Sequence, residues 1–525
     1  MLESIILTAT NYWHFVFPAI IVAYLTANYF KHGLNKYPGP FLASLTDIWR
    51  FIDVWNRRPD ITQLSLHRKH GDVVRLGPNT ITFSDPAAIK TIYGLNKGFV
   101  KSGFYPPQQA ISRGTRLPSL FSTTDESYHA SLRRSVNAAF SMSALVQYEP
   151  LVNEVITLFL SRTSTIYART GAVCDFALWL QYFAFDVIGQ ITYTKQHGFV
   201  DKNEDIDGMI AYLGRLFSYV APVGQIPWLD LLFLKNPIVR LLDYMGFKLF
   251  AFPITAFAQT RMTERLSEIK SNKAQGLAPS TGRGDLLSMF LKAQTDRPDF
   301  MTDQRVLTMA VSMAFAGSET TAISLAAVFY FLLKHPDCYT KLQEELDGAI
   351  QTGKIETRES GLVSWAESQT LPYLDAVIKE SFRMHPAAGL PLERITPPQG
   401  IEICGKFVPG GTIVGCNAWV IHRHEPTFSV NGRYNVDTFN PDRWLECTKE
   451  QRKEMEGTMF QFGAGSRTCI GKNISLLEVY KLVPSFLRRF EVTLDDPAKE
   501  WKLHNAWFVK QLDFNVRFRE RTMEA

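Results

Sequence analysis

The chain has 525 residues, of which 46% are hydrophobic and 20% charged, and its formal net charge is +5 at pH 7. This composition supplies enough apolar residues for a large core and too little positive charge for a nucleic-acid surface, so a disordered protein and a nucleic-acid-binding protein are both excluded. The length fits about three or four domains, or one large globular unit with a membrane anchor.

The amino terminus predicts a membrane anchor. No Asp, Glu, Lys or Arg occurs from Ser4 to Phe30, and Lys31 and Lys36 follow directly. Roughly 20 apolar residues are enough to cross a bilayer. A cleaved signal peptide is the alternative, but the stretch lacks a basic leading region and a small-residue cleavage site. Because the positive charges follow the span, we expect the rest of the chain in the cytoplasm.

A proline-rich hinge and short strands come next. In KYPGPF, Pro38 and Pro40 bracket Gly39, and this pattern cannot continue a helix. Residues 73–84, VVRLGPNTITFS, predict a small hairpin, and residues 401–414 predict another short strand region. Long segments with helical periodicity lie between them, so the chain is predicted to be mainly α.

Residues 304–334 predict one long helix of about 45 Å. Between Arg305 and Lys334 the segment carries a single charge, Glu319, so a second membrane span is an alternative. Against it, residues 317–321, GSETT, put polar groups at the middle of the segment, where a bilayer tolerates them least. A buried carboxylate beside a hydroxyl is costly without partners or a task, so we expect this helix to cross a protein core at a reaction site.

Two shorter segments offer charged residues. In YLDAVIKESFRMHP, Glu380 and Arg383 are three residues apart on one helical face, a spacing that is common in solvated ion pairs. FNPDRW, residues 439–444, is a loop that offers Arg443. Taken alone, neither segment indicates a site.

The stretch FGAGSRTCIG, residues 462–471, places Cys469 on a glycine-rich loop directly before an apolar periodic segment. It is not a Walker A loop, because Lys472 is followed by Asn473 rather than Ser or Thr. The six cysteines are scattered, with no C-x-x-C pair and no C-x-x-C-H, which argues against a disulfide framework, a zinc ribbon, a four-cysteine iron–sulfur centre and a c-type haem. The other cysteines, interpreted as inert free thiols, are Cys174, Cys338, Cys404, Cys416 and Cys447.

In the order AGSETT, ESFR, FNPDRW and FGAGSRTCIG, these segments resemble the cytochrome P-450 family of haem-thiolate monooxygenases. The cysteine loop matches the family pattern F-x-x-G-x-R-x-C-x-G at Phe462, Gly465, Arg467, Cys469 and Gly471. The resemblance covers nearly the whole chain, since the anchor and the Pro-Gly-Pro hinge are similar to those of membrane-bound members. The segments GKNISLLEVYKLVP and HNAWFVKQ are similar to those of fungal members such as pisatin demethylase.

The resemblance implies the family's multihelical fold with small β-sheets, in which haem lies between the long central helix and the cysteine loop. Cys469 would be the axial ligand of the iron of haem b, and its place at a helix amino terminus favours the thiolate. Gly465 and Gly471 would let the backbone approach the macrocycle and the sulfur closely.

The resemblance also implies roles for residues around the haem. Glu319 and Thr320 would be the catalytic acid and alcohol, which deliver protons through ordered water. Gly317 would thin the long helix so that oxygen fits beside it. A buried structural network behind the haem would consist of Glu380, Arg383 and Arg443.

The haem propionates need cations, and the resemblance implies four residues around them. Arg467 lies in the cysteine loop, and Arg394 in PLERITP matches the family's propionate-binding strand. In HASLR, His129 and Arg133 are four residues apart on one helix face. Many members have tryptophan at the position of His129, and an exposed helical histidine is the alternative there.

The family contacts substrate through segments that correspond here to residues 101–121 and 209–234, and the abundance of Phe, Leu and Tyr in them fits a lipophilic small molecule and contact with the membrane. Core packing explains the same aromatic residues equally well. No single residue is therefore predicted to contact the substrate.

The resemblance implies an enzyme of the endoplasmic reticulum membrane, with an anchor (1–30), a hinge (31–45) and a cytoplasmic haem-thiolate catalytic domain (46–525). It would insert one oxygen atom from O2 into a hydrophobic small molecule, in fungal biosynthesis of a polyketide, terpenoid or mycotoxin or in detoxification. The chain has no flavin or nicotinamide motif, so electrons would come from a separate NADPH-cytochrome P-450 reductase, with a cytochrome b-type protein as a further donor.

Two alternatives remain at this point. A haem-thiolate isomerase or dehydratase would not use O2, and the pair Glu319 and Thr320 speaks against it. A polytopic membrane protein would put Cys469 on the lumenal side, where Asn473-Ile474-Ser475 is a glycosylation sequon.

Overall fold

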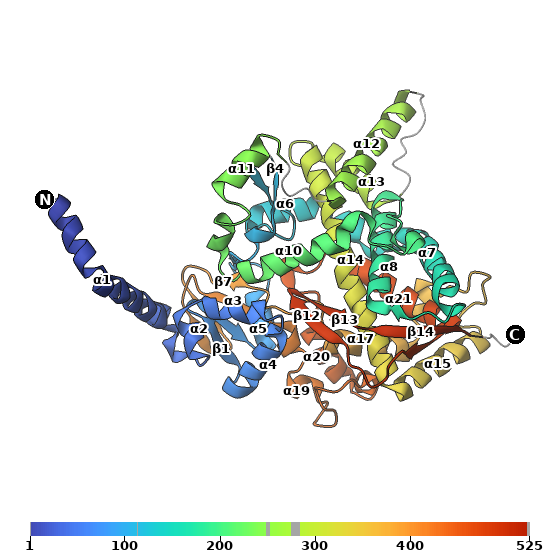
Figure 1. The fold of residues 1–525 in the computed structure, drawn as a ribbon. Helices are drawn as coiled ribbons and strands as arrows, with labels where there is room; N and C mark the ends of the chain where they lie inside the picture. The colour runs from blue at the N-terminus through green and yellow to red at the C-terminus, as the bar shows by residue number, and fades with distance from the viewer. Residues whose placement is uncertain (1, 113, 248–252, 275–283, 522–525) are drawn as a thin grey trace.

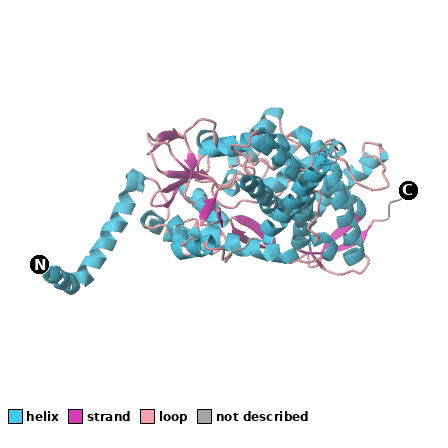
Figure 2. Cartoon of the chain, turned by 90° about the horizontal axis from the view of Figure 1, so that it is seen from above, coloured by secondary structure: helices cyan, strands magenta, loops and turns pink. Residues whose placement is uncertain are grey.

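The structure is a computed structural model that describes residues 2–112, 114–247, 253–274 and 284–521. The described chain is mainly helical, and its short strands gather in small sheets (Figures 1 and 2). The mainly α fold with small β-sheets that the sequence predicts is therefore confirmed.

The helices are α1 (Leu2–Phe30), α2 (Phe41–Leu45), α3 (Ile48–Trp55), α4 (Pro59–His70), α5 (Ala87–Ile92), α6 (Glu126–Val136), α7 (Met142–Thr163), α8 (Phe176–Tyr193), α9 (Phe199–Lys202), α10 (Met209–Val223), α11 (Pro237–Tyr244), α12 (Pro253–Ala274), α13 (Leu286–Asp296), α14 (Asp303–Lys334), α15 (Pro336–Gln351), α16 (Trp365–Ser368), α17 (Pro372–Met384), α18 (Ala418–Ile421), α19 (Glu425–Phe428), α20 (Lys449–Thr458) and α21 (Lys472–Arg489). The strands are β1 (Val73–Gly77), β2 (Thr80–Phe83), β3 (Val100–Lys101), β4 (Ala110–Ser112), β5 (Thr115–Leu117), β6 (Cys174–Asp175), β7 (Arg394–Ile395), β8 (Ile401–Ile403), β9 (Lys406–Val408), β10 (Ile413–Cys416), β11 (Phe490–Leu494), β12 (Lys502–Ala506), β13 (Phe508–Leu512) and β14 (Asn515–Glu520).

Helix α1 leaves the body of the molecule as a long projection (Figure 1). Its apolar part, from Trp13 onward, is long and hydrophobic enough to span a membrane and is almost entirely exposed. The end of the helix is different, because it is bound to the body. The side-chain amide of Asn28 donates to the carbonyl of Leu45 (2.8 Å), and Arg75 donates to the carbonyl of Tyr29 (2.8 Å).

The largest sheet has five strands in the order β1-β2-β10-β7-β3. Strands β1 and β2 form the predicted antiparallel hairpin, in which Gly77 pairs with Thr80 across the Pro78-Asn79 turn. Strand β10 runs parallel to β2 and antiparallel to β7, so it joins the hairpin to a segment far along the chain. The predicted strand region at 401–414 is confirmed as β8, β9 and the start of β10.

Helix α14 crosses the centre of the body and packs against α8, α12, α17 and α21 (Figure 1). It is apolar and long enough to span a membrane, but 67% of its most apolar window is buried inside the protein. A lipid-facing helix would expose that surface, so α14 is a core helix as predicted, and the alternative of a second membrane span is wrong. In the sequon, the Asn473 side chain donates to the carbonyl of Phe140 (3.0 Å) and is partly buried.

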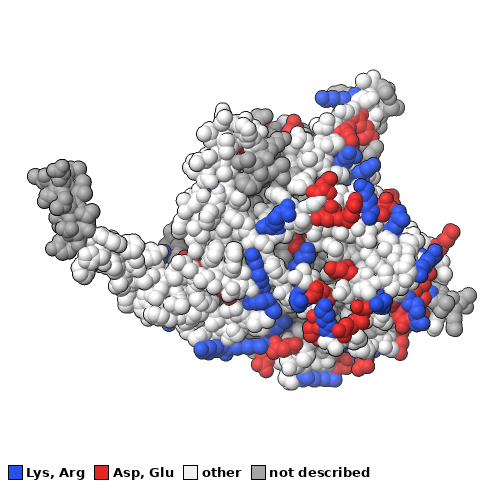
Figure 3. All heavy atoms as spheres, in the orientation of Figure 1, with Lys and Arg blue, Asp and Glu red and all other residues white. Residues whose placement is uncertain are grey.

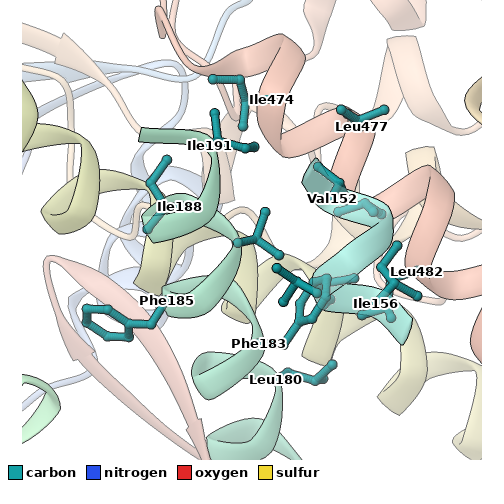
Figure 4. Close-up of a cluster of buried hydrophobic side chains, with 14 of the residues drawn as sticks. Val152, Ile156, Leu180, Phe183, Phe185, Ile188, Ile191, Ile474, Leu477 and Leu482 are labelled. Atoms are coloured by element: carbon teal, nitrogen blue, oxygen red, sulfur yellow. The ribbon is translucent and has the colours of Figure 1, made fainter. Parts of the chain in front are cut away.

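Around α14, helices α7, α8 and α21 enclose an aliphatic and aromatic core (Figure 4). Figure 4 shows Val152 and Ile156 of α7 facing Phe183 of α8 and Leu477 and Leu482 of α21. All five side chains are fully buried. This packing holds the start of α21, and with it the cysteine loop, in a defined position beside α14.

Candidate functional site

Cys469 lies between a short turn at Gly465–Arg467 and the first residue of α21, Lys472. Its backbone N–H donates to the carbonyl of Phe462 (2.8 Å), which folds the loop back on itself. Burial raises the pKa of the Cys469 thiol, whereas the backbone N–H groups of Gly471 and Lys472 and the nearby Arg133 lower it. Burial is the larger effect, so the pKa of the thiol stays above its ordinary value, and the N–H groups at the start of α21 offset that rise only in part.

The surroundings of the two glycines Gly465 and Gly471 of this loop differ. Gly465 has φ +65°, and a Cβ there would lie 1.7 Å from the carbonyl oxygen of Tyr93. Close approach to Tyr93 therefore requires this glycine, and its approach to the macrocycle stays a prediction. At Gly471 a Cβ would meet no described protein atom within 4 Å, so protein packing does not require glycine at that position. Phe462 packs edge-on against Phe382, with ring centroids 5.9 Å apart.

The middle of α14 lies against the start of α21. The Thr321 hydroxyl donates to Ser475 Oγ (3.1 Å), one helical turn beyond the cysteine loop. In this part of α14, Ala316 is exposed and Phe315, Gly317 and Thr320 are half-buried, and Cys469 is exposed as well. Ala316 and Thr320 thus leave part of the middle of α14 uncovered near the cysteine loop.

Glu319 and Thr320 are neighbours in sequence but have separate surroundings. The Thr320 hydroxyl donates to the carbonyl of Ala316 (2.7 Å), one turn earlier on α14. The Glu319 carboxyl is buried, and its Oε2 has no hydrogen-bond partner among the described residues. Burial raises the pKa of Glu319, and Lys510 on β13 lowers it in part. A buried carboxyl oxygen without a partner is costly, which is typical of a functional group.

Gly317 has a structural role that differs from the one implied by the resemblance. A Cβ at this position would lie 3.0 Å from Ile188 Cγ1 on α8. Gly317 thus faces α8 and lets α14 pack closely against it. The resemblance implied that Gly317 thins the helix on its haem side. That expectation is wrong, because the space left by the missing side chain faces α8 instead.

Glu380, Arg383 and Arg443 lie together and are completely buried. Arg383 Nε donates to Glu380 Oε2 and Arg443 Nε donates to Glu380 Oε1, both at 2.8 Å. Burial would raise the pKa of Glu380, but the two guanidinium groups hold it below its ordinary value. Arg443 also donates to the carbonyls of Asn435 (2.9 Å) and Thr438 (3.0 Å), so the network ties α17 to the loop that precedes α20.

Basic side chains converge beside the cysteine loop. Burial, together with the nearby Arg467, Arg133, Lys101 and Arg394, lowers the pKa of His129 to about 3. His129 is therefore a buried neutral imidazole, and the alternative of an exposed helical histidine is excluded.

Each arginine of this cluster is held in place. Arg133 donates to the carbonyl of Thr468 (2.7 Å), and Arg394 donates to the carbonyl of Glu393 (2.8 Å). Arg467 binds Glu126 through Nη2 (2.7 Å) and Nε (3.2 Å). These contacts orient the guanidinium groups without neutralising all of them.

Lys101 is a member of this cluster that the sequence does not single out. It is buried on the two-residue strand β3, and its ammonium donates to the carbonyl of Phe121. Burial, Arg394 and Arg467 hold the pKa of Lys101 well below its ordinary value. No motif or periodic pattern marks this lysine, because pairing of β3 with β7 carries it to the site.

This set of side chains fits haem. The cluster contains the imidazole of His129 and four basic side chains. Among the charged groups that influence Lys101, one is a carboxylate, Glu126. Such a surplus of basic groups suits the propionates of a haem, and Cys469 offers a thiolate to its iron. A mainly helical fold that presents one cysteine at a helix start, beside a long buried helix and a basic cluster, defines a haem-thiolate protein.

Comparison with known proteins agrees with this class. Residues 43–513 match the family model described as Cytochrome P450. The chain is 41% identical over 488 residues to "Cytochrome P450 monooxygenase cicH" of Emericella nidulans, covering 93% of this chain and 94% of that protein. A "Cytochrome P450 monooxygenase" of Aspergillus terreus is 40% identical over 499 residues, covering 94% and 97%.

A solved structure described as the heme domain of cytochrome P450DA matches with a TM-score of 0.70 and 21% identity, over 89% of this chain and 94% of that one, which supports the fold. The chain therefore belongs to the cytochrome P450 family and is a monooxygenase, an oxidoreductase. The more specific similarity to pisatin demethylase stays a prediction.

Proposed function

We propose that the chain is a membrane-anchored, haem-dependent monooxygenase that inserts one oxygen atom from O2 into a hydrophobic small molecule of fungal secondary metabolism or detoxification. The observation that carries this proposal is the position of Cys469, at the start of α21 and beside the middle of α14 where Thr320 lies. Relatives named as monooxygenases occur in several fungi, among them mpaDE of Penicillium brevicompactum, 34% identical over 94% of this chain.

In this proposal the chain holds haem b at both its iron and its propionates. Cys469 Sγ would hold the haem iron, and the N–H groups of Gly471 and Lys472 would support the negative charge on the sulfur. The propionate partners are His129, Lys101, Arg133, Arg394 and Arg467. Haem, when bound, supplies the activation of O2 with electrons from a reductase.

Proton delivery is the proposed task of Glu319 and Thr320. Because burial raises its pKa, the Glu319 carboxyl holds its proton more firmly than an exposed glutamate and can act as a donor. The Thr320 hydrogen is already donated to the carbonyl of Ala316. The Thr320 oxygen is then left to accept a hydrogen bond from a proton carrier beside α14.

The proposed location is the endoplasmic reticulum membrane, with α1 as a single-pass anchor. A second apolar surface supports this proposal, and Figure 3 shows the part of the body around α11 as a mainly uncharged surface. Its exposed residues are Trp228, Leu231, Leu232, Phe233, Ile238, Leu241, Tyr244, Met245 and Phe247. A patch of this kind marks a contact with a membrane or another apolar partner.

The carbon-monoxide complex of the reduced protein tests the proposal. We expect the red-shifted Soret band of a thiolate ligand, and Cys469→His should abolish this band. Cys416→Ala is the matched control, because Cys416 is a buried free thiol on β10 outside the cysteine loop. Loss of the band in the Cys416 variant with retention in Cys469→His would show that the ligand is assigned to the wrong cysteine.

A further inference from the structure

A continuous series of aromatic rings lies next to the candidate haem site. The rings belong to segments that are far apart in sequence and meet around β12 and β13, and each packs edge-on against the next. We call this series the aromatic wall, and its members are Phe315, Phe217, Phe508, Trp507, Phe121 and Tyr105. The successive ring centroids are 5.2, 4.9, 6.3, 5.8 and 5.6 Å apart.

Both ends of the aromatic wall reach the proposed site. At one end, Phe315 directly precedes the exposed Ala316 on α14, one turn before Thr320. At the other end, the Tyr105 hydroxyl accepts a hydrogen bond from Arg394 (3.3 Å), and the Lys101 ammonium lies 4.0 Å from the centre of the Tyr105 ring. The wall therefore extends from the helix that carries Thr320 to the basic cluster.

Trp507 holds an unfavourable backbone conformation at the centre of the wall. Ala506 pairs with Phe508, so Trp507 alone forms the turn between β12 and β13, with φ +82°. A bulky residue is strained at this φ, and glycine or asparagine would adopt it more easily. Its ring stacks on Phe104, with centroids 4.4 Å apart, and is almost fully buried. The strain indicates that the ring itself is needed there.

Three rings of the wall are buried, and the other three, which we call its front rings, are partly exposed. Trp507, Phe217 and Tyr105 are at most 4% exposed and pack against the front rings. Phe121 is 44% exposed, although its ring packs against both Tyr105 and Trp507. Phe315 and Phe508 are half-buried. These three front rings retain aromatic surface that protein atoms do not cover.

We propose that the aromatic wall binds an aromatic ring of the substrate, so that the enzyme acts on an uncharged, planar aromatic molecule; this inference rests on the proposed function. Rings that already meet edge to face offer a further ring both stacked and edge-on contacts, whereas a saturated ring gains only apolar burial. The basic groups nearest the wall, Lys101 and Arg394, are proposed partners of the haem propionates, and each also donates to a backbone carbonyl, that of Phe121 or Glu393. A charged substrate would find them already bound.

Calorimetric titration of the haem-loaded, full-length enzyme tests this inference with two ligands of the same skeleton, 2-naphthol and its saturated counterpart decahydro-2-naphthol. We expect 2-naphthol to bind about three- to tenfold more tightly, which is the range of aromatic pairing beyond apolar burial. This comparison uses the unaltered chain, so it does not depend on whether a variant folds. Equal binding of the two ligands would overturn the inference.

Leucine substitutions at the front of the wall keep apolar volume and remove the ring. Phe508→Leu and Phe315→Leu should each weaken 2-naphthol binding about three- to tenfold and change decahydro-2-naphthol binding less than about twofold. Phe407→Leu is the matched control, because Phe407 is an exposed phenylalanine on β9 outside the wall and should leave both affinities unchanged. If the wall variants lose the same affinity for both ligands, the wall contributes only apolar packing, and the inference is overturned.

The titration tests the aromatic wall, and the carbon-monoxide spectrum tests the proposed function, so either can fail without the other. Calorimetry needs no turnover, so a chain with the thiolate band but without aromatic preference would contradict only the aromatic wall. A chain that prefers 2-naphthol but never gives the thiolate band would contradict the proposed function instead.

Discussion

Thr320 makes the same backbone hydrogen bond as Thr308, another threonine of α14. Comparing the two therefore separates the proposed proton-delivery role of Thr320 from its effect on the helix. Both Thr320 and Thr308 donate to the backbone carbonyl four residues earlier, each at 2.7 Å. Only Thr320 lies beside exposed Ala316 in the buried middle of the helix. A bond to the helix backbone contributes little to stability, so any special effect of Thr320 must come from what its oxygen accepts.

Thr320→Ala should leave haem incorporation and substrate binding nearly unchanged while it lowers the product formed per NADPH consumed. Positioned proton transfer is typically worth about 10²- to 10⁴-fold, and we expect the lower end or less because water substitutes in part. Hydrogen peroxide should rise as product falls, and Thr308→Ala should change neither. If Thr320→Ala still forms as much product per NADPH as the unaltered chain, either another group delivers the proton, such as the neighbouring Ser318 or Thr321, or the enzyme does not use this oxygen chemistry. Feeding peroxide without reductase separates these two outcomes.

At the scale of elements, two buried arginines join α17 to the loop before α20. Arg383 of α17 donates to the carbonyls of Val436 (2.7 Å) and Thr438 (3.0 Å), and Arg443 bonds the loop from the other side. Arg443 Nε binds Glu380, and its two terminal nitrogens donate to the carbonyls of Phe428, Asn435 and Thr438. A lysine keeps the charge but lacks the planar fork that reaches several acceptors at once. The loop therefore depends on the shape of this side chain as well as on its charge.

Arg443→Lys should lower the free energy of unfolding by roughly 2–4 kcal/mol, because buried carbonyls and the Glu380 carboxylate lose donors. Arg433→Lys is the control, since Arg433 lies in the same loop, is 61% exposed and pairs with Glu446, so we expect a change below about 0.5 kcal/mol. Denaturant unfolding and haem content measure both effects. Unchanged stability together with reduced turnover per bound haem would instead give Arg443 a role in the chemistry.

At the scale of the whole molecule, the proposed anchor helix α1 is bonded to the body at its carboxyl end. Arg75 is almost fully buried on β1, and it donates to the carbonyls of Asn28 and Tyr29, each at 2.8 Å. Its remaining acceptors are the carbonyls of Gly77 (3.1 Å) and Pro78 (2.8 Å). The last turn of α1 thus completes the hydrogen bonding of a buried cation in the body.

Deleting residues 1–26 should weaken membrane association and leave stability and haem binding unchanged. Deleting residues 1–30 should still allow haem binding but lower the free energy of unfolding by about 1.5–3 kcal/mol for each acceptor that Arg75 loses. Membrane sedimentation and denaturant unfolding of both truncations measure the difference, and the exposed apolar surface at 228–247 should leave some residual membrane binding. Complete loss of fold after removal of residues 1–26 would contradict an anchor that is separate from the body.

The sequence by itself determined the features that depend on local pattern. The uncharged stretch before Lys31 predicts the projecting helix α1, and the turn at Pro78-Asn79 predicts the β1–β2 hairpin. The spacing within residues 462–471 was enough to indicate the cysteine loop and the family. These features follow from neighbouring residues, because helix period, turn chemistry and apolar length are properties of a continuous segment.

Only the tertiary structure decided which residues from distant segments meet. Strand pairing carries Lys101 to the basic cluster, the packing of α14 against α8 turns Gly317 toward Ile188, and the aromatic wall joins α10, α14, the β12–β13 turn and the segment before α6. None of these contacts has a local signature, because a lysine, a glycine or a phenylalanine has the same helix or strand preference whatever lies opposite it. Which partner it meets depends on how the helices and strands pack, and a single sequence does not specify those long-range pairings locally.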